Sequence, residues 1–443
     1  MDSIYSSSIL TIVAMGNSHA NEGIPGVSLS RLPKVAKIGR VLLTRSTPSL
    51  DDALLNTVYE SRAWTLQEKV LSKRCLFFSG QEVFFRCNAG IYREMEKDVS
   101  VKLGATNSIY RMNSVNPLVK LNRDTALEKW ISVQGFNWDE HFGHYAFLVQ
   151  DYTKRRLSFP GDVLLAFAGI QAQFTAHSGG GFICGLPELM LDYSLLWTSR
   201  HGFRRIRRTA PVSISNAVSI QAPSWSWAGW DGPVGGFLDP NSSLKSVSLV
   251  NRFHVFTPHD GSRIVNRRSD SNVAEDEHHS SSDSEILSKV LERSLFSTYF
   301  LIFTSETVDL PILRVLHHIN GKQPWKSPTA WILDKSLTRT GILLDDIPAD
   351  VESEPERFSF VGLGLSHWGA IPSLDLRDGK DFMNPWRQWL PKDTSMPTVH
   401  VMLIKWIDCG GESIGLAERV AIGVIWGEAW KTAYPKPRKI VLQ

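Results

Sequence analysis

The chain has 443 residues, of which 42% are hydrophobic, and this length allows a large buried core divided over two or three domains. Lys and Arg together number 48, and Asp and Glu number 45, so the net charge of +3 creates no overall field that would attract nucleic acid or an anionic membrane. Either partner would need a local patch of charge. The cysteines form no CxxC pair and are too scattered for a disulfide framework, which fits a reducing compartment; they are Cys75, Cys87, Cys184 and Cys409.

The N-terminus contains a short apolar run, ILTIVAM at residues 9–15, that superficially resembles part of a secretory signal. A secretory signal begins with a basic region, whereas this segment has Asp2 and no Lys or Arg. The run is also far shorter than the ~20 apolar residues that a membrane-spanning helix needs. We therefore expect a cytoplasmic protein without a membrane span.

The same apolar run predicts a strand buried on both faces, as in a parallel sheet that helices cover on each side. Residues 1–8 are too few to supply the neighbouring strands and crossover helices of such a sheet. The sequence therefore predicts that the N-terminal α/β region is the back part of a covered parallel sheet, truncated at its start.

Helical and strand patterns alternate through the rest of the first ninety residues. Residues 16–28 are rich in Gly and Asn and predict a loop, and residues 40–44 predict a short strand. From Ser49 onward, apolar residues at helical spacing predict a helix that is broken near Ser61. Residues 75–87 then predict two strands joined by a turn.

The remaining sequence divides by composition into a helical region, residues 96–200, and a β-rich C-terminal domain, residues 201–443, after an α/β region of residues 1–95. A polar, Ser-rich stretch at residues 258–285 predicts a disordered insertion in the β-rich domain. Four segments of the middle region have apolar residues at the i, i+3 and i+4 spacing of helices: residues 125–136, 143–158, 160–177 and 186–197.

The common nucleotide-binding fingerprints are missing from the sequence. It contains no GxxxxGK[ST] phosphate loop, and its glycine clusters miss the GxGxxG spacing. Residues 139–144 (DEHFGH) place two acids and two histidines together, but without further Cys or His at ligand spacing a helix start is the commoner explanation. We predict no metal site.

Two further clusters have both a binding and a structural explanation. Residues 200–208 contain five arginines that could grip phosphate, but only Phe203 offers a stacking ring, so a solvated or carboxylate-paired loop is the commoner case. Trp225, Trp227 and Trp230 alternate as on a strand, so two rings would share one face. Such a face could bind carbohydrate or a partner, although core packing is the commoner role of clustered tryptophans.

Residues 62–87, RAWTLQEKVLSKRCLFFSGQEVFFRC, resemble the closing motif of the fungal heterokaryon-incompatibility (HET) domain. Residues 1–28 resemble the preceding segment of the same family, and residues 222–234 and 401–425 resemble the region that follows the domain. The segments that open a full HET domain, with Leu-Ser-Tyr-x-Trp-Gly and Trp-Ile-Asp-x-x-Cys patterns, are not found before Met1. The resemblance therefore implies an N-terminally incomplete HET domain.

The resemblance implies a fungal protein of allorecognition, which triggers regulated cell death through a protein partner and is compatible with a homo-oligomer. HET domains have been likened to Toll/interleukin-1 receptor (TIR) domains, some of which cleave NAD. On that likeness Glu68 would stabilise an oxocarbenium-like centre at the nicotinamide ribose, and Trp64 and Arg62 would contact the substrate. NAD would then be a substrate, and no cofactor is implied. Because the opening segments are missing, we expect this activity to be latent or lost.

Residue types alone also allow a structural explanation, in which Trp64 belongs to the core and Glu68 pairs with Arg62 or Lys69 on a solvated flank. The alternative function is a non-catalytic interaction module built on the β-rich C-terminal half. The predicted fold class is α/β plus mainly β: an incomplete TIR-like α/β HET remnant, a helical middle segment and a β-rich C-terminal domain.

Overall fold

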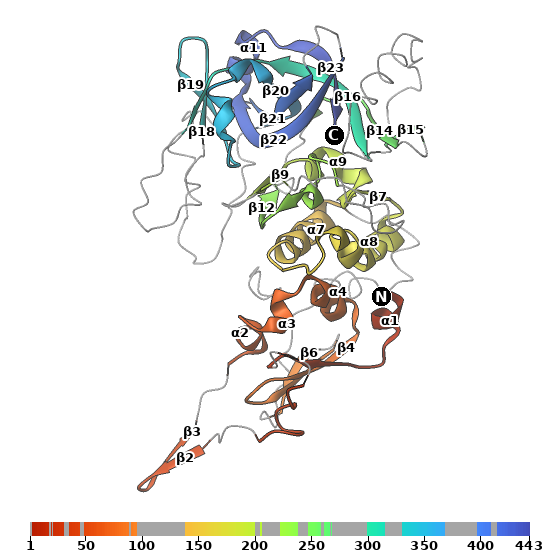
Figure 1. Cartoon of the computed structure of the whole chain (residues 1–443), viewed down its shortest axis with the longest axis vertical. Helices are drawn as coiled ribbons and strands as arrows, with labels where there is room; N and C mark the ends of the chain where they lie inside the picture. Colours follow the sequence, from red (N-terminus) through yellow and green to blue (C-terminus); the bar gives the residue numbers. More distant parts are fainter. Residues whose placement is uncertain are drawn as a thin grey trace. The chain divides into compact units, whose positions relative to one another are not determined.

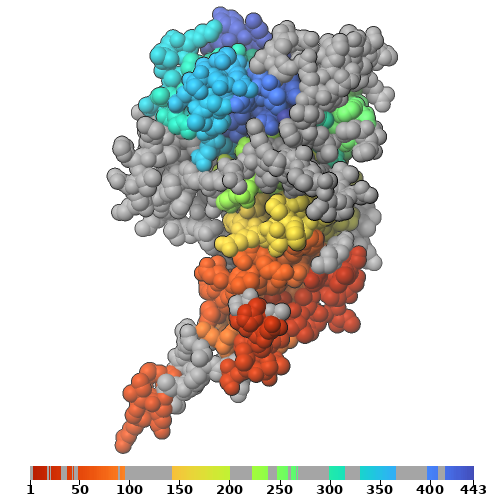
Figure 2. Space-filling view, in the orientation of Figure 1, coloured from red at the N-terminus to blue at the C-terminus, as the bar shows by residue number. Residues whose placement is uncertain are grey.

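The protein forms two compact units in a computed structural model (Figures 1 and 2). Unit 1 contains Met1–Asn137, Asp151–Ser178 and Leu376–Lys380, and unit 2 contains Trp138–Gln150, Gly179–Asp375 and Asp381–Gln443. The structure describes residues 2–16, 19, 21–30, 35–44, 48–87, 90–94, 138–199, 204–205, 222–237, 247–257, 261–265, 267, 299–314, 330–367, 397–408 and 414–443. Within these ranges, no helix is long and apolar enough to cross a bilayer.

A four-stranded sheet with the order β1-β4-β5-β6 forms the centre of unit 1 (Figure 1). Its strands are β1 (Thr11–Ala14), β4 (Arg74–Phe78), β5 (Val83–Cys87) and β6 (Gly90–Arg93). The strand pair predicted at residues 75–87 is confirmed. Only the β1–β4 pair is parallel. Strands β4 and β5 are joined by a tight turn, which is closed by a 3.1 Å hydrogen bond from Ser79 N to Glu82 O. Such a turn can link only antiparallel strands. The sheet is therefore mixed rather than parallel.

Strand β1 corrects the prediction of a strand buried on both faces. It is an edge strand, and only the face that carries Val13 (2% exposed) packs against helices. Ile12, on the opposite face, is 62% exposed, and Ile9, just before the strand, is 82% exposed. The described part of the sheet is thus covered on one side, so a continuous apolar run does not here indicate two covered faces.

Three short helices lead into β4: α2 (Leu50–Leu54), α3 (Val58–Ser61) and α4 (Ala63–Leu71). The Oγ of Ser49 caps α2, and the Oγ of Thr57 caps α3 by accepting the backbone N–H of Glu60 at 3.1 Å. The predicted break near Ser61 is confirmed, and the second cap introduces an additional break. Leu50, Leu54 and Tyr59 from the first two helices pack onto the covered face of the sheet.

A separate hairpin precedes these helices. The short strand predicted at residues 40–44 is β3 (Val41–Thr44), which pairs antiparallel with β2 (Val35–Ile38). Gly39, with φ of +60°, and Arg40 make the two-residue turn, and glycine is favoured where such a turn needs positive φ at its first position. Unit 1 also contains the short helix α1 (Asp2–Ser7) and the longer helix α8 (Leu165–Ser178).

The helices predicted at residues 143–158 and 160–177 are confirmed by α7 (Trp138–Tyr152) and α8. The helix predicted at residues 186–197 is largely wrong: a 3₁₀ turn at Glu188–Met190 and α9 (Leu191–Ser194) lie between the strands β8 (Leu186–Pro187) and β9 (Trp197–Ser199). Pairing of β9 with β12 (Val234–Phe237) overrides the local helical pattern. The segment 125–136 and the domain boundaries predicted after residues 95 and 200 lie outside the described residues.

Unit 2 is dominated by an eleven-stranded sheet, which confirms the β-rich character predicted for the C-terminal half. Pairing closes a ring of strands in the order β16-β20-β21-β22-β23 and back to β16, in which only the β22–β23 pair is parallel (Figure 1). The ring strands are β16 (Phe300–Val308), β20 (Phe358–His367), β21 (Pro397–Asp408), β22 (Ile414–Trp426) and β23 (Lys436–Leu442). The others are β13 (Val247–Ser248), β14 (Phe253–Thr257), β15 (Gly261–Ile264), β17 (Ile312–Arg314), β18 (Ala330–Leu333) and β19 (Arg339–Leu343).

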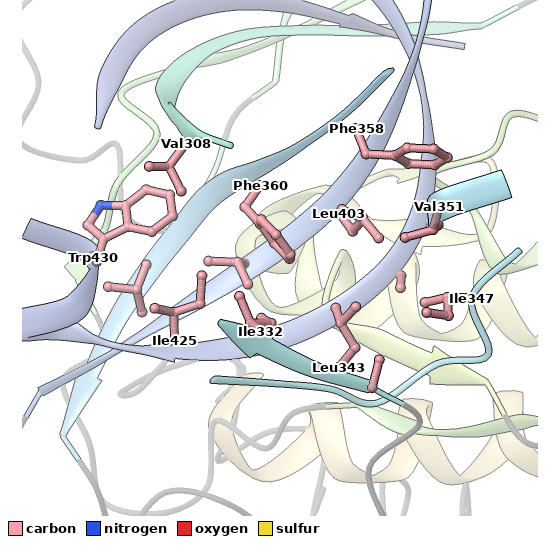
Figure 3. Packing of buried hydrophobic residues seen from close by; sticks show 14 residues of the cluster. Val308, Ile332, Leu343, Ile347, Val351, Phe358, Phe360, Leu403, Ile425 and Trp430 are labelled. Carbon is pink, nitrogen blue, oxygen red and sulfur yellow. The ribbon is translucent and has the colours of Figure 1, made fainter. Parts of the chain in front are cut away.

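The core of unit 2 lies against one face of these strands (Figure 3). Phe360 of β20, Leu403 of β21 and Ile425 of β22 point into it, together with Trp430 of the short helix α11 (Gly427–Thr432). Met402, on the opposite face of β21, is also fully buried. Unlike the sheet of unit 1, this sheet has strands that are buried on both sides.

The tryptophan cluster differs from its prediction in geometry but not in role. Trp227 begins a 3₁₀ turn, Trp227–Gly229, so the three rings do not alternate along a strand. Trp225 and Trp227 are nevertheless fully buried, and the indole N–H of Trp227 donates to the Tyr145 hydroxyl at 3.1 Å. Core packing is therefore confirmed for these two residues.

The prediction of a disordered insertion at residues 258–285 is wrong for the part that the structure describes. Strand β15 lies inside that stretch and pairs with β14. Val265 is fully buried, and Arg267 donates to Asp192 Oδ1 at 2.6 Å. The polar composition here reflects ion pairing with the rest of unit 2, because Arg263 likewise pairs with Glu188 at 2.7 Å.

Candidate functional site

The three residues assigned to the candidate site lie at the start and on one face of α4. Arg62 is the residue before the helix, and it is exposed. Trp64 and Glu68 are one helical turn apart and are the two half-buried residues in a helix whose other side chains are buried. The structure therefore places Trp64 and Glu68 on one face and Arg62 beside its start.

Thr65 fixes the start of α4, where the capping position carries no side-chain cap. Its Oγ1 donates to the backbone carbonyls of Tyr59 at 2.5 Å and of Arg62 at 2.7 Å. The Tyr59 hydroxyl donates in return to the carbonyl of Thr65 at 3.4 Å. Thr65 is fully buried, so this exchange satisfies polar groups that would otherwise be costly to remove from water.

Gln67 binds the helix α8 within unit 1. Its Oε1 accepts the backbone N–H of Gly169 at 2.7 Å, and its side chain is 1% exposed. Leu66, its neighbour, is equally buried. Leu66 and Gln67 thus hold α4 in place by packing and by one buried hydrogen bond.

Glu68 is bound to the N-terminal helix. Tyr5, on α1, lies close enough to interact with the Glu68 carboxylate, and burial together with that nearby negative charge raises the pKa of Tyr5. Arg62 lies close enough for its positive charge to oppose this shift in the pKa of Tyr5. The Glu68 side chain therefore already has the Tyr5 hydroxyl as a neighbour in this structure.

The main chain strengthens the same connection. The carbonyl of Glu68 accepts the Ser72 hydroxyl at 2.7 Å, and Ser72 Oγ lies 2.7 Å from Thr11 Oγ1 of β1. Thr11 in turn lies 3.1 Å from the hydroxyl of Ser8, just after α1. The C-terminal end of α4 is thus linked to β1 and α1 by a chain of hydroxyl groups.

Lys69 does not pair with Glu68, as the structural explanation had allowed, but with Glu60 at 2.5 Å. Glu60 also binds the guanidinium of Arg155, and Arg155 pairs with Asp151 at 2.9 Å. Two acids and two bases, one of them Lys69 of α4, thus form a charge-balanced network. Sequence reasoning missed it because Glu60 and Arg155 are 95 residues apart and neither lies in a recognisable motif.

The ionisation of this network follows from its burial. Burial lowers the pKa of Lys69, and the charge of Glu60 only partly offsets that effect. Burial acts to raise the pKa of Asp151, but the charges of Arg155 and Lys69 together hold it below its usual value. The Asp151 carboxylate therefore remains charged at neutral pH, and the network is an ion-pair scaffold rather than a proton-transfer group.

Neither of the other two polar clusters noted in the sequence forms a described site. Residues 139–144 lie on α7, where His144 is buried, and nowhere in the described ranges do three potential ligand side chains gather around a metal position. Of the arginine-rich stretch, the structure describes Arg204 and Arg205, which form β10 and pair with β11 (Trp230–Asp231).

Unit 2 contains a deeply buried ion pair of its own, between Arg419 and Asp345 at 3.4 Å. The guanidinium stacks over the Trp197 ring and donates to the carbonyl of that residue. Asp345 also accepts the backbone N–H groups of Ser199 and, at 2.7 Å, Ile422. Burial lowers the pKa of Arg419 to about 9. Because its partners are mostly main-chain groups, this pair joins strands and has the character of a structural site.

We expect Glu60→Gln to lower the free energy of unfolding of unit 1 by about 2–3 kcal/mol. The substitution keeps the size of the side chain but leaves Lys69 and Arg155 with only Asp151 as a counter-charge. Urea unfolding followed by circular dichroism measures the effect.

The matched control for this measurement is Glu354→Gln, which breaks an exposed ion pair with Arg357. Water screens that pair, so its loss should cost no more than about 0.5 kcal/mol. If the two variants lost equal stability, the network around Glu60 would not be a scaffold.

Comparison with known proteins finds one family that matches the N-terminal end of the chain. Residues 1–68 match the model of the family described as heterokaryon incompatibility protein (HET). No curated protein and no solved structure is significantly similar to the chain. The matched segment runs from α1 through β1 and the β2–β3 hairpin to Glu68 in α4. The resemblance expected from the sequence is therefore confirmed for residues 1–68, which are similar to the HET family.

Proposed function

We propose that this protein acts in heterokaryon incompatibility, as a cytoplasmic fungal allorecognition protein whose response to a protein partner is regulated cell death. The observation that carries the proposal is the match of residues 1–68 to the HET family, which covers the α1–α4 arrangement built around Glu68. In this proposal unit 1 produces the effect and the β-rich unit 2 supports it. A homo-oligomer is compatible with the proposal.

We further propose that a TIR-like NAD-cleaving activity, if α4 derives from such an enzyme, is latent or lost. A carboxylate that stabilises an oxocarbenium-like ribose must face the substrate at the moment of bond cleavage. Glu68 instead interacts with Tyr5 of α1, and Lys69, the nearest basic side chain in sequence, is committed to Glu60. Trp64 and Arg62 would still flank a substrate bound at that face, with NAD as the substrate and no cofactor.

The distinction between latent and lost depends on Tyr5. If the activity is latent, α1 must move so that Tyr5 leaves Glu68, and weakening their interaction should favour that movement. If the activity is lost, removal of the Tyr5 hydroxyl will not restore turnover. Tyr5 is half-buried, so its hydroxyl can be removed without opening a large cavity.

We expect the purified chain to release nicotinamide from NAD no faster than its Glu68→Gln variant. The matched variant Tyr5→Phe removes only the hydroxyl beside Glu68, and turnover that appears in Tyr5→Phe and disappears in the double variant would identify a latent enzyme. Chromatographic measurement of nicotinamide distinguishes these cases. Turnover by the unmodified chain that Glu68→Gln abolishes would contradict the proposal and make Glu68 catalytic.

The alternative is a non-catalytic interaction module built on unit 2. The observation in its favour is that this unit has a closed ring of strands and its own core, which could support a binding surface without unit 1. The two functions differ in which unit must be folded for cell death to follow hyphal fusion.

We expect the full-length gene, expressed in hyphae that fuse with an incompatible tester strain, to cause death of the fusion cells, and Leu66→Asp to abolish it. Leu66 is 1% exposed, so a buried carboxylate there should unfold unit 1. The control Val401→Asp disrupts the core of unit 2 in the same way. Vital staining scores the outcome, and immunoblots verify protein levels. Death that survives Leu66→Asp but not Val401→Asp would contradict the proposal and favour the interaction module.

A further inference from the structure

The segment between Glu22 and Asp51 differs from the rest of the chain in charge. It contains no acidic and no aromatic residue, and it contains five basic ones: Arg31, Lys34, Lys37, Arg40 and Arg45. Five positive charges in this segment exceed the net charge of +3 of the entire chain. The positive charge that the overall composition does not reveal is therefore concentrated in the part of the sequence that contains the β2–β3 hairpin.

The hairpin sorts its side chains by face. In an antiparallel pair, residues directly opposite each other lie on the same side, so Ile38 and Val41 share one face, and Leu43, two residues from Val41, lies on it too. These three side chains are aliphatic. Ile38 is 65% exposed, Val41 is 58% exposed and Leu43 is 49% exposed, and the hairpin atoms are open to view in Figure 2. An aliphatic strip of this kind is costly to leave in water.

The cationic side chains lie at the other positions of the same hairpin. Lys37 alternates with Ile38 and so projects from the opposite face, and Arg40 lies in the turn. Both are exposed. The hairpin thus combines an aliphatic face with two exposed positive charges, one at Lys37, which pairs with Leu42 on the back, and one at Arg40 in the turn.

Strands β2 and β3 pair only with each other among the strands of the structure. A two-stranded hairpin is at best marginally stable in water unless another surface covers its apolar face. This hairpin therefore has the properties of an element that is completed by binding. Its occupant must accept aliphatic side chains and positive charge together.

We propose that the β2–β3 hairpin binds the surface of an anionic lipid bilayer. A bilayer interface offers acyl chains to Ile38, Val41 and Leu43 and phosphate groups to Lys37 and Arg40. Nucleic acid would satisfy the charges only, since the segment lacks an aromatic ring for stacking and its aliphatic face would stay in water. A second copy would cover the aliphatic face but would bring like charges together, with no acidic residue in the segment to neutralise them.

The geometry favours a hairpin that lies on the membrane rather than one that spans it. The outer edges of a two-stranded hairpin carry unpaired backbone N–H and C=O groups, which water and lipid headgroups can satisfy but hydrocarbon cannot. With the aliphatic face at the acyl boundary, Lys37 and Arg40 can extend to the headgroup phosphates. Binding should therefore depend both on lipid charge and on the aliphatic side chains.

Sedimentation of the purified full-length chain with lipid vesicles tests the proposal. We expect binding to vesicles that contain phosphatidylserine, weak binding to pure phosphatidylcholine, and loss of binding as salt is raised. Each basic residue near an anionic surface contributes about fivefold to the affinity, so Lys37→Glu/Arg40→Glu should weaken binding at least about 25-fold. Ile38→Ser/Val41→Ser should weaken it at least about tenfold without changing the charge.

A matched control is Lys335→Glu/Leu337→Asn, which changes one exposed base and one exposed aliphatic residue in the turn between β18 and β19. This variant should bind like the unmodified chain, and circular dichroism should show that all variants are folded. Equal binding to neutral and anionic vesicles, or equal loss in the control, would overturn the proposal. Absence of vesicle binding would also overturn it. In that case, poly(U) binding that Lys37→Glu/Arg40→Glu removes would indicate nucleic acid, and a dimer that Ile38→Ser/Val41→Ser dissociates would indicate a second copy.

Discussion

Buried polar side chains on α4 constrain unit 1 more strongly than any other feature of its sequence. A helix that buries Thr65, Gln67 and Lys69 is stable only where each of them meets a partner, since an unpaired buried polar group costs roughly 1–3 kcal/mol and a charge costs more. The backbone of α3, the N–H of Gly169 on α8 and the carboxylate of Glu60 supply those partners. The position of α4 relative to these elements follows from the three interactions.

This constraint gives the residues around Glu68 a structural meaning. Thr65, Leu66 and Gln67 are buried and hold the helix, and Trp64 and Glu68 are left half-buried on its other face. Glu68 interacts with Tyr5 of α1, so the residue best suited for chemistry also serves as an anchor for the N-terminal helix. A pattern shared with the HET family can therefore reflect the requirements of packing, and the proposed loss or latency of NAD cleavage is consistent with that.

Local sequence patterns predicted the helices and strands of this fold, whereas contacts between distant residues determined how strands are buried and which charges pair. The break near Ser61 was predictable because helical spacing is interrupted locally, and the strands at residues 75–87 because aromatic and β-branched residues flank a turn. The one-sided burial of β1 was not predictable, because an edge strand and a central strand can have the same composition. The partner of Lys69 was also unpredictable, because Glu60 is bound together with Arg155 from a distant part of the chain. For the same reason, Glu68 could be assigned to the candidate site but its contact with Tyr5 could not be foreseen.

The central claim is that Glu68 is an anchoring residue, and a double-mutant cycle of Tyr5→Phe and Glu68→Gln tests it most directly. An interaction of a hydroxyl with a charged group of this partial exposure should couple the two residues by about 1 kcal/mol in the free energy of unfolding. We predict that each single variant is destabilised and that the double variant loses about 1 kcal/mol less than the sum of the two. Additive effects, with no coupling between Tyr5 and Glu68, would contradict the account.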